Sequence, residues 1–460
     1  MTKLEFRHDV ERGLGSCVLA LKDEAARERF RPLVLWACGR DTAYDAQSEG
    51  SRGYYLSLLI RQYPDPAPFL DVIETRLFRS MRGRGWEFAQ DCDLLAYLCS
   101  GGAGRAWEIL MRCYDRLYTT LRQKRRPGKY GICPERDNFE AMCISLVSLC
   151  SMDRTQKCKI YRRIARDLGF LYVGNPLFSD WFFDWFQTVS EKALGGSAVQ
   201  RILCEQDTGI AASARAMEQY RRKWSEPRPE ADGSRPQNAE EIYAALKAGG
   251  YGSSFLWAGR LWRRDRQEEL AKLAEFYYAE TDPRMRRELL FILQLKPCAR
   301  MLRLDVLLAD SRSEDKDLAY CAFRALCCHK DGRVRAYAYE LLQGDTHIAQ
   351  AVSLLAVNYT DADRAALTGA VRRVPIDRKD LCWHNAFCKV MDLFHAHKAH
   401  GLNELLPYFY RNTLCSCCRE SVVKEMGRRH MLTPELLWEM QYDCNDGIRA
   451  YAAKRLRAAN

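Results

Sequence analysis

Four aspartates recur at nearly constant intervals in the first half of the chain. The intervals are 46, 46 and 43 residues, and an apolar run with helical spacing follows each aspartate, at Asp45, Asp91, Asp137 and Asp180. A helix start leaves N–H groups unpaired, and an aspartate at or near the cap satisfies one of them, worth about 1 kcal/mol. The pattern therefore predicts a cap at each helix start. In the alternative interpretation, the carboxylates line one edge of a groove, where they receive a basic peptide or orient arginines.

Polar and aromatic side chains are concentrated between Trp36 and Tyr55. Arginine and tyrosine are favoured at the energetic centres of protein interfaces, and loops often carry binding residues. One interpretation is a contact surface for a partner, and the other is an Arg–Glu network that holds the first repeats together. The candidate partner-binding residues of this group are Arg40, Tyr44, Asp45, Glu49, Arg52 and Tyr55.

The segment 180–186 is rich in aromatic residues. Trp181 and Trp185 share one face of the expected helix, as do Asp180 and Asp184, because residues four apart are neighbours on a helix. Large aromatics dominate protein cores, so a packed core is one interpretation of this stripe. The other is a binding face, and we keep all four residues as candidate partner contacts.

Basic residues cluster at 122–129, 221–223 and 260–266. A Pro-Gly pair within the first run predicts an exposed turn. These runs either contact phosphate groups or are solvated surface, as short charge runs usually are. The candidate phosphate contacts are Arg125, Arg126, Lys129, Arg263 and Arg264.

Cysteine and histidine are abundant toward the C-terminus, in two groups. Zinc modules usually pair their ligands at short Cys–Cys and His–His spacings, and neither group has two such pairs in register. We therefore assign no metal site and no cofactor, and zinc binding by this region stays an open question. Most of the 20 cysteines are expected to be reduced core residues. The two groups are Cys382, His384, Cys388, His395, His397 and His400, and Cys415, Cys417, Cys418, His430 and Cys444.

No sequence motif specifies a reaction. The chain lacks a Walker-type phosphate loop, Gly-x-Gly-x-x-Gly after a strand, Gly-x-Ser-x-Gly and His-Glu-x-x-His, which disfavours the known nucleotide and hydrolase folds. Its net charge of +11 permits attraction to anionic partners without demonstrating it. The N-terminus shows no secretion signal, and no apolar stretch approaches the roughly 20 residues that span a bilayer. We therefore expect a cytoplasmic protein without membrane contact.

Helical periodicity dominates the chain, and no strand alternation or hairpin signal persists. We predict an all-α protein, and the aspartate interval matches one HEAT- or armadillo-type helical pair of roughly 40–47 residues. The segment 225–238 is rich in proline and almost free of apolar residues, which predicts a linker. It separates N-terminal helical repeats at 1–224 from C-terminal repeats at 239–460. Asn238 is expected to cap the next helix.

The C-terminal half resembles HEAT repeats, whose second helix typically opens with Asp, then Val-Arg and an Ala-rich turn. Residues 331–338 read Asp-Gly-Arg-Val-Arg-Ala-Tyr-Ala, and residues 446–452 read Asp-Gly-Ile-Arg-Ala-Tyr-Ala, with weaker versions from Asp282 and Glu420. The resemblance covers about 280–460 by motif and the rest by period alone. It implies an α-solenoid of HEAT-like helical pairs that binds partners on a long concave face.

Two hypotheses of function follow. The first is a non-catalytic interaction or scaffold protein that binds a protein or peptide partner in the concave groove. The second is a nucleic-acid-binding solenoid: the segment 180–186 is similar in residue types to the HEAT-like bacterial alkylpurine DNA glycosylases, although no catalytic residue transfers. Charge separates the two hypotheses, because nucleic acid needs clustered arginine and lysine on the concave face, whereas a peptide groove can be acidic or mixed.

Overall fold

The computed structural model describes a purely helical chain. Within the described residues every regular element is a helix and no strand occurs, which confirms the predicted all-α class. No helix in this part of the chain is both long and apolar enough to cross a bilayer. The described residues are 1–459 except 84–85, 100–101, 125–132, 151–152, 173–179, 226–237, 250–266, 295–297, 345–346, 378–380 and 398–399.

Packing divides the chain into two compact units. Unit 1 comprises Met1–Arg228 together with Thr413–Asn460, and unit 2 comprises Pro229–Asn412. The boundary at 228 falls inside the segment predicted as a linker. The boundary at 412 has no counterpart in the sequence pattern, because residues 413–460 pack with the N-terminal residues.

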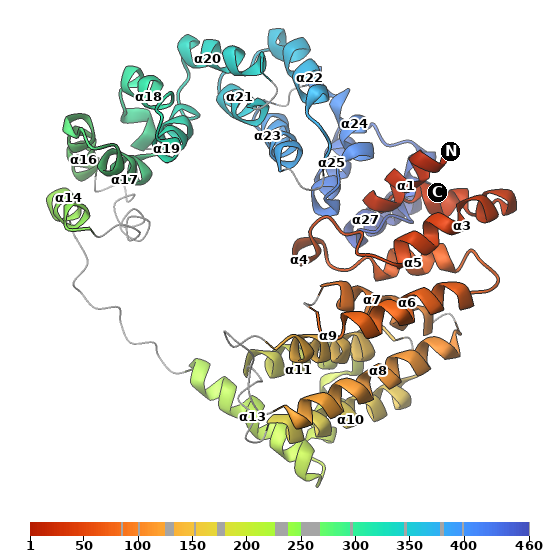
Figure 1. Ribbon diagram of the computed structural model, residues 1–460. Coiled ribbons are helices and arrows are strands. Elements are labelled where there is room, and N and C mark those ends of the chain that lie inside the picture. Colours follow the sequence, from red (N-terminus) through yellow and green to blue (C-terminus); the bar gives the residue numbers. More distant parts are fainter. Residues whose placement is uncertain are drawn as a thin grey trace. The chain divides into compact units, whose positions relative to one another are not determined.

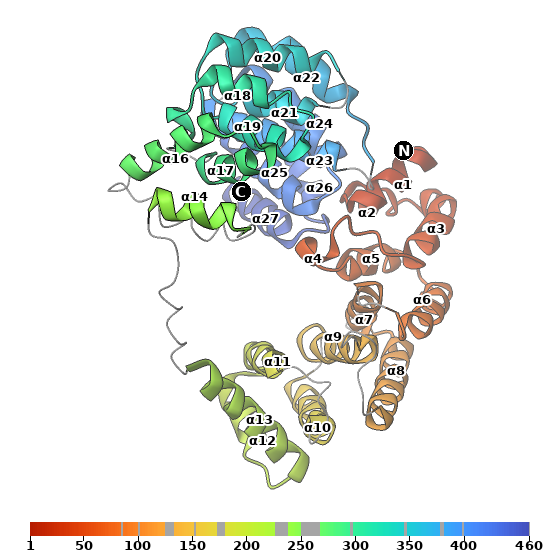
Figure 2. The same ribbon diagram turned by 60° about the vertical axis from the view of Figure 1, so that its left-hand side comes forward.

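Most helices of unit 1 lie in two rows (Figures 1 and 2). In the first row α5, α7, α9, α11 and α13 each contact the next, and in the second α6, α8, α10 and α12 do the same. The bounds are α1 Lys3–Arg12, α2 Ser16–Ala20, α3 Glu24–Cys38, α4 Ala46–Glu49, α5 Gly53–Ile60, α6 Ala67–Ser80, α7 Trp86–Cys99, α8 Gly104–Gln123, α9 Pro134–Ser148, α10 Arg154–Tyr172, α11 Asp180–Leu194, α12 Gly196–Leu203, α13 Thr208–Ser225, α25 Ser416–Arg428, α26 Pro434–Met440 and α27 Asp446–Ala459.

One apolar core runs through the helices from α1 to α13. Helix α8 shows how the sequence builds it: its buried residues recur at the i, i+3, i+4 and i+7 spacing of an amphipathic helix. Burial raises the pKa of the Cys113 thiol on this helix to about 12, and the described cysteines are all free thiols. The buried stripe of α8 is Ala106, Ile109, Leu110, Cys113, Tyr114, Leu117 and Leu121.

The C-terminal segment of unit 1 packs onto its first helices. The Cys444 N–H donates to the Gly13 carbonyl at 2.8 Å, and the Ser416 N–H donates to the Glu49 carboxylate at 2.8 Å. Gly13 has a φ of +73°, and a Cβ there would overlap the Cys444 side chain. Glycine is therefore required at this position both by its conformation and by the close approach of the two segments.

Unit 2 is built from neighbouring pairs of helices, with α16 on α17, α18 on α19 and α20 on α21. The predicted cap at Asn238 is confirmed, since its side chain accepts the Glu241 N–H at 2.8 Å. Asp331, the first residue of the segment 331–338, caps α20 and accepts the Arg333 N–H at 2.8 Å. The bounds are α14 Ala239–Lys247, α16 Gln267–Ala279, α17 Pro283–Leu293, α18 Leu304–Asp310, α19 Lys316–Leu326, α20 Gly332–Leu342, α21 Ile348–Leu355, α22 Arg364–Arg373, α23 Cys382–His397 and α24 Leu405–Asn412, with 3₁₀ turns η3 Cys298–Met301, η4 Asp361–Asp363 and η5 His400–Leu402.

The four recurrent aspartates do not share one structural role. Asp45 is the cap of α4 and accepts the Gln47 N–H at 3.1 Å. Asp91 corrects the prediction, because it is buried inside α7, where its carboxylate lies 3.2 Å from the Arg76 guanidinium. Burial raises its pKa, and Arg76 opposes that rise. A carboxylate in the middle of a helix has no free N–H to cap, so a distant arginine compensates its charge instead.

The third aspartate also departs from the predicted cap. Helix α9 begins at Pro134, and Cys133 occupies the cap position. Asp137 lies in the first turn, half-exposed, and its carboxylate is 2.6 Å from the Arg136 guanidinium. An acid in the first turn still complements the positive end of the helix dipole. Asp180 is the first residue of α11, and its side chain lies outside the described part of the chain.

Candidate functional site: a groove across three helices of unit 2

One hollow in the described residues lies wholly in unit 2. It has a volume of about 830 Å³ and is bordered mainly by α19, α21 and α23. We call it the unit 2 groove. Its lining residues are Gln294, Tyr320, Phe323, Arg324, Cys327, Cys328, Ala349, Gln350, Ser353, Ala356, Asn385, Cys388, Lys389 and Asp392.

Helical spacing explains why these side chains all face the unit 2 groove. On α19 and just beyond it, the lining positions 320, 323, 324 and 327 fall on one face, while Leu318, Ala322 and Ala325 are buried on another. The lining positions 385, 388, 389 and 392 repeat the same spacing on α23. Residues three and four apart share a helix face. Helices α19 and α23 therefore each carry a row of side chains that faces the groove and is not packed into the core.

Amide side chains provide hydrogen-bonding capacity in the groove. Gln294, at the end of α17, is only 2% exposed, and its Nε2 donates to the Phe291 carbonyl at 3.0 Å. Its Oε1 has no hydrogen-bond partner within the described structure. This acceptor is itself buried, so Gln294 forms part of the groove wall and is not an accessible hydrogen-bonding group. Gln350 and Asn385 add two further amides to the same lining.

Two aromatic side chains add apolar surface to the groove. Tyr320 is 59% exposed although it is large, and Phe323 is half-buried one turn further along α19. Exposed aromatics beside polar groups are typical of binding surfaces, because they bury a large area at a small entropic cost.

The charged groups leave a small positive balance. Lys389 Nζ lies 3.2 Å from the Asp392 carboxylate, so these two charges compensate each other. Arg324 lies 5.9 Å from the centre of the Tyr320 ring and has no carboxylate partner among the described residues. Burial raises the pKa of the Cys327 thiol to about 12, which makes it a poor nucleophile. The described lining of the groove therefore offers one arginine, a lysine–aspartate pair, amides and aromatics.

The cluster predicted around residue 45 makes its contacts inside unit 1. Glu49 pairs with the buried Arg52 at 2.8 Å. The hydroxyl of Tyr55 is buried and donates to the Leu14 carbonyl at 2.8 Å. Arg40 is exposed, with its guanidinium 4.2 Å from the centre of the Trp36 ring. Tyr44 is half-buried and Asp45 caps α4, so internal contacts occupy most of the polar groups in this cluster.

The predicted aromatic segment is described only in part. On α11, Trp185 is 42% exposed, and its ring packs edge-on against Phe182. The Asp184 carboxylate lies 3.4 Å from the Arg221 guanidinium. The side chains of Asp180 and Trp181 lie outside the described residues, as do the candidate phosphate contacts Arg125, Arg126, Lys129, Arg263 and Arg264.

The cysteine- and histidine-rich residues fall in different units. Cys382, His384, Cys388, His395 and His397 lie on α23 of unit 2. Cys417 and Cys418 lie on α25 of unit 1, and Cys415 is its cap.

Sequence patterns alone did not single out the unit 2 groove. The helical spacing of Tyr320, Phe323 and Arg324, and of Asn385 and Lys389, could have indicated side chains that share a helix face. It marks a polar and aromatic stripe opposite a conventional apolar one. Comparison with known proteins adds no precedent for the groove: no protein-family model matches the chain, and no curated protein or solved structure is significantly similar to it.

Proposed function

We propose that this protein is a non-catalytic scaffold of HEAT-like helical pairs that binds an extended peptide segment of a protein partner in the unit 2 groove. One observation carries the proposal: neighbouring helices present unburied stripes whose amides and aromatics face one hollow. The packing of α16 on α17, α18 on α19 and α20 on α21, with Asp331 as a cap in the HEAT-like motif, supports the solenoid part of the proposal.

The chemistry of the lining defines the expected peptide. A side-chain amide both donates and accepts hydrogen bonds, so Gln350 and Asn385 suit the repeating N–H and C=O groups of an extended backbone. Tyr320 and Phe323 suit an apolar side chain of the peptide. Arg324 has no carboxylate partner among the described residues, and it suits an acidic side chain. The expected ligand is therefore an extended peptide that carries an acidic residue near an apolar one.

A peptide array tests this proposal. Soluble protein would be probed against short peptides that combine one acidic and one apolar residue at varied spacing, and the best binder would be measured by fluorescence anisotropy. Phe323→Ala should weaken binding roughly tenfold, because aromatic anchors carry much of the energy of an interface. Asn385→Ala should weaken it several-fold.

The matched control is Gln343→Ala, an exposed amide at the end of α20 outside the groove lining. It should leave peptide affinity unchanged. Equal affinity in all three variants would contradict the proposal, as would an array without any binder. Tight binding of labelled DNA or RNA that falls steeply with salt, and that the groove variants leave intact, would favour the nucleic-acid hypothesis instead.

A further inference from the structure

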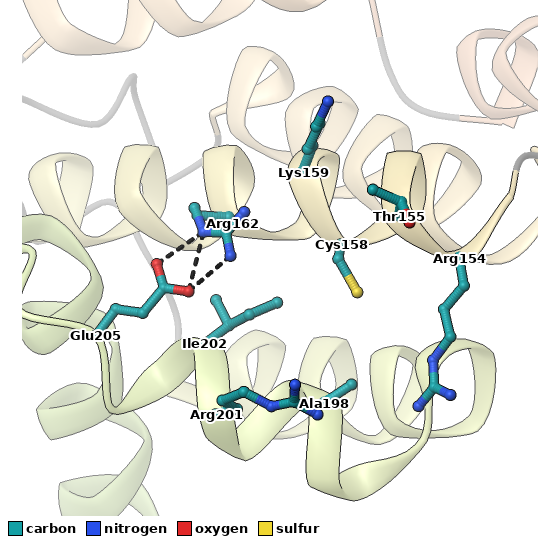
Figure 3. Close-up of a pocket in the computed structure, with 9 residues that line it drawn as sticks. All are labelled: Arg154, Thr155, Cys158, Lys159, Arg162, Ala198, Arg201, Ile202 and Glu205. Atoms are coloured by element: carbon teal, nitrogen blue, oxygen red, sulfur yellow. Dashed lines mark hydrogen bonds and ion pairs between the residues drawn. The ribbon is translucent and has the colours of Figure 1, made fainter.

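A second hollow, in unit 1, has a different chemical character. It lies between α10 and α12 and has a volume of about 420 Å³ (Figure 3). No residue of the unit 2 groove takes part in it. Its lining residues are Arg154, Thr155, Cys158, Lys159, Arg162, Ala198, Arg201, Ile202 and Glu205.

Basic groups outnumber acidic ones in this pocket. Glu205 is the one acid among the described lining residues, and its carboxylate accepts bonds from Nε and Nη2 of Arg162 at 2.7 Å each (Figure 3). The bond from Arg162 lowers the pKa of Glu205. The ionised glutamate therefore neutralises Arg162 and leaves the remaining basic side chains in excess.

Two arginines of the lining have no internal counter-charge. Among the described residues neither Arg154 nor Arg201 forms an ion pair or a side-chain hydrogen bond. Figure 3 shows the Arg154 side chain reaching from the start of α10 toward α12, while Lys159 points away from the hollow. Repulsion between uncompensated guanidinium groups is unfavourable, and an anion placed between them would relieve it.

The start of α12 adds to the positive potential. Gly195 is the cap residue and provides no side-chain hydrogen bond to the helix. A Cβ at this position would come within 3.5 Å of Arg154 Nη2, so the guanidinium lies beside the uncapped helix end. Helix N-termini carry a partial positive charge and favour anions.

We propose that this pocket binds a phosphate monoester. Arginine forks match the oxygen geometry of a phosphate and bind its dianion strongly, and Thr155 adds a hydroxyl donor. The volume suits a phosphate with a small substituent. Glu205 acts as an internal anion that holds the Arg162 fork in position and competes with the ligand for it.

Chemical protection of Cys158 tests the pocket directly. Its thiol lies between the two helices in Figure 3, and its rate of alkylation by iodoacetamide would be followed by mass spectrometry at increasing phenyl phosphate. The exposed Cys417 on α25 is the internal reference. Saturable protection of Cys158 but not of Cys417 is the expected result, and the half-saturating concentration gives the affinity.

Substitutions make the test specific. Arg154→Gln and Arg201→Gln should each weaken phenyl phosphate binding roughly tenfold, as expected for loss of a charge-assisted bond. Glu205→Gln should tighten binding several-fold, because it removes the competing anion and releases Arg162. Arg215→Gln, an exposed arginine on α13 outside the pocket, is the matched control and should change nothing. A merely structural role for Glu205 would not predict tighter binding.

The source of the phosphate is distinguished by two further probes. A phosphoserine peptide that binds more tightly than phenyl phosphate, with no binding by its unphosphorylated form, would support a phosphorylated partner side chain. Equal affinity for phenyl phosphate and the peptide would support a free phosphate monoester. Absence of protection at any phenyl phosphate concentration would overturn the proposal. Arg154-dependent binding of a single-stranded oligonucleotide without phenyl phosphate protection would overturn it as well.

Discussion

At the scale of single residues, buried charges are the features that most depend on the fold. Glu140 on α9 is buried, and its nearest compensating charge is Arg136, with Nε 3.8 Å from the carboxylate. Burial raises the pKa of Glu140 to about 8, and Arg136 only partly opposes that rise. The buried carboxyl is therefore protonated at neutral pH.

A pH-dependent stability follows from Glu140. The folded protein holds this proton up to about pH 8, whereas the unfolded chain releases it near pH 4.3, the usual value for glutamate. Stability should therefore fall as pH rises between these values. Glu140→Gln cannot ionise and should reduce that loss. Thermal unfolding measured at a series of pH values would show a flatter profile for the variant.

The control for this prediction is Glu108→Gln, which changes an exposed glutamate on α8. It should keep the pH dependence of the parent protein. A Glu140→Gln profile parallel to that of the parent would mean that the carboxyl is ionised in the folded state.

At the scale of elements, the same amphipathic helix can serve the core or a ligand, depending on which of its faces is covered. The apolar stripe of α8 is buried in the core. Helix α19 buries one stripe, and its other stripe lines the unit 2 groove.

Close approach of helices also restricts side-chain size. At Gly15 a Cβ would overlap the backbone carbonyl of Glu439 on α26.

Gly15→Ala should consequently loosen the C-terminal segment of unit 1. Overpacking of this kind costs about 1–3 kcal/mol, and α26 would have to move away from α2. Hydrogen exchange at the amides of α26 and α27 should accelerate in the variant. Gly104→Ala is the matched control, because no neighbouring atom lies within 4 Å of the added Cβ. Unchanged protection of α26 in Gly15→Ala would contradict the observed packing.

At the scale of the whole molecule, unit 1 is assembled from the two ends of the chain. Arg419 and Asp443 are both fully buried and joined by two bonds of 3.0 Å, which fixes α25 relative to the turn before α27. The Arg449 guanidinium lies 4.1 Å from the centre of the Tyr54 ring. The segment 413–460 thus contributes to the same packed unit as the N-terminal helices.

Cleavage between the units tests this assembly. A protease site inserted between residues 228 and 229 would give two fragments, of which the second contains 413–460. The fragments should stay together on size-exclusion chromatography after cleavage, because the last segment remains packed on the first. The same cleaved protein ending at residue 412 should separate. Separation of the full-length fragments, or association of the shortened ones, would contradict the assignment of 413–460 to unit 1.

Local features were determined by the sequence alone. The all-α class and the cap at Asn238 could be predicted, because capping and helical periodicity depend on residues within a turn or two of each other. The cap predicted at Asp91 was wrong, because its partner Arg76 comes from a different helix. No local pattern reveals such a partner.

Which surfaces stay open was decided only by the tertiary structure. The stripe of Tyr320, Phe323 and Arg324 has ordinary helical spacing, and whether it is core or groove depends on what packs against it. The same holds for Arg154 and Arg201, whose positions matter because α10 and α12 bring them to one hollow. The union of 413–460 with the N-terminal helices likewise depends on contacts between distant residues. Burial and charge compensation are properties of the packed chain, so they were settled by tertiary contacts.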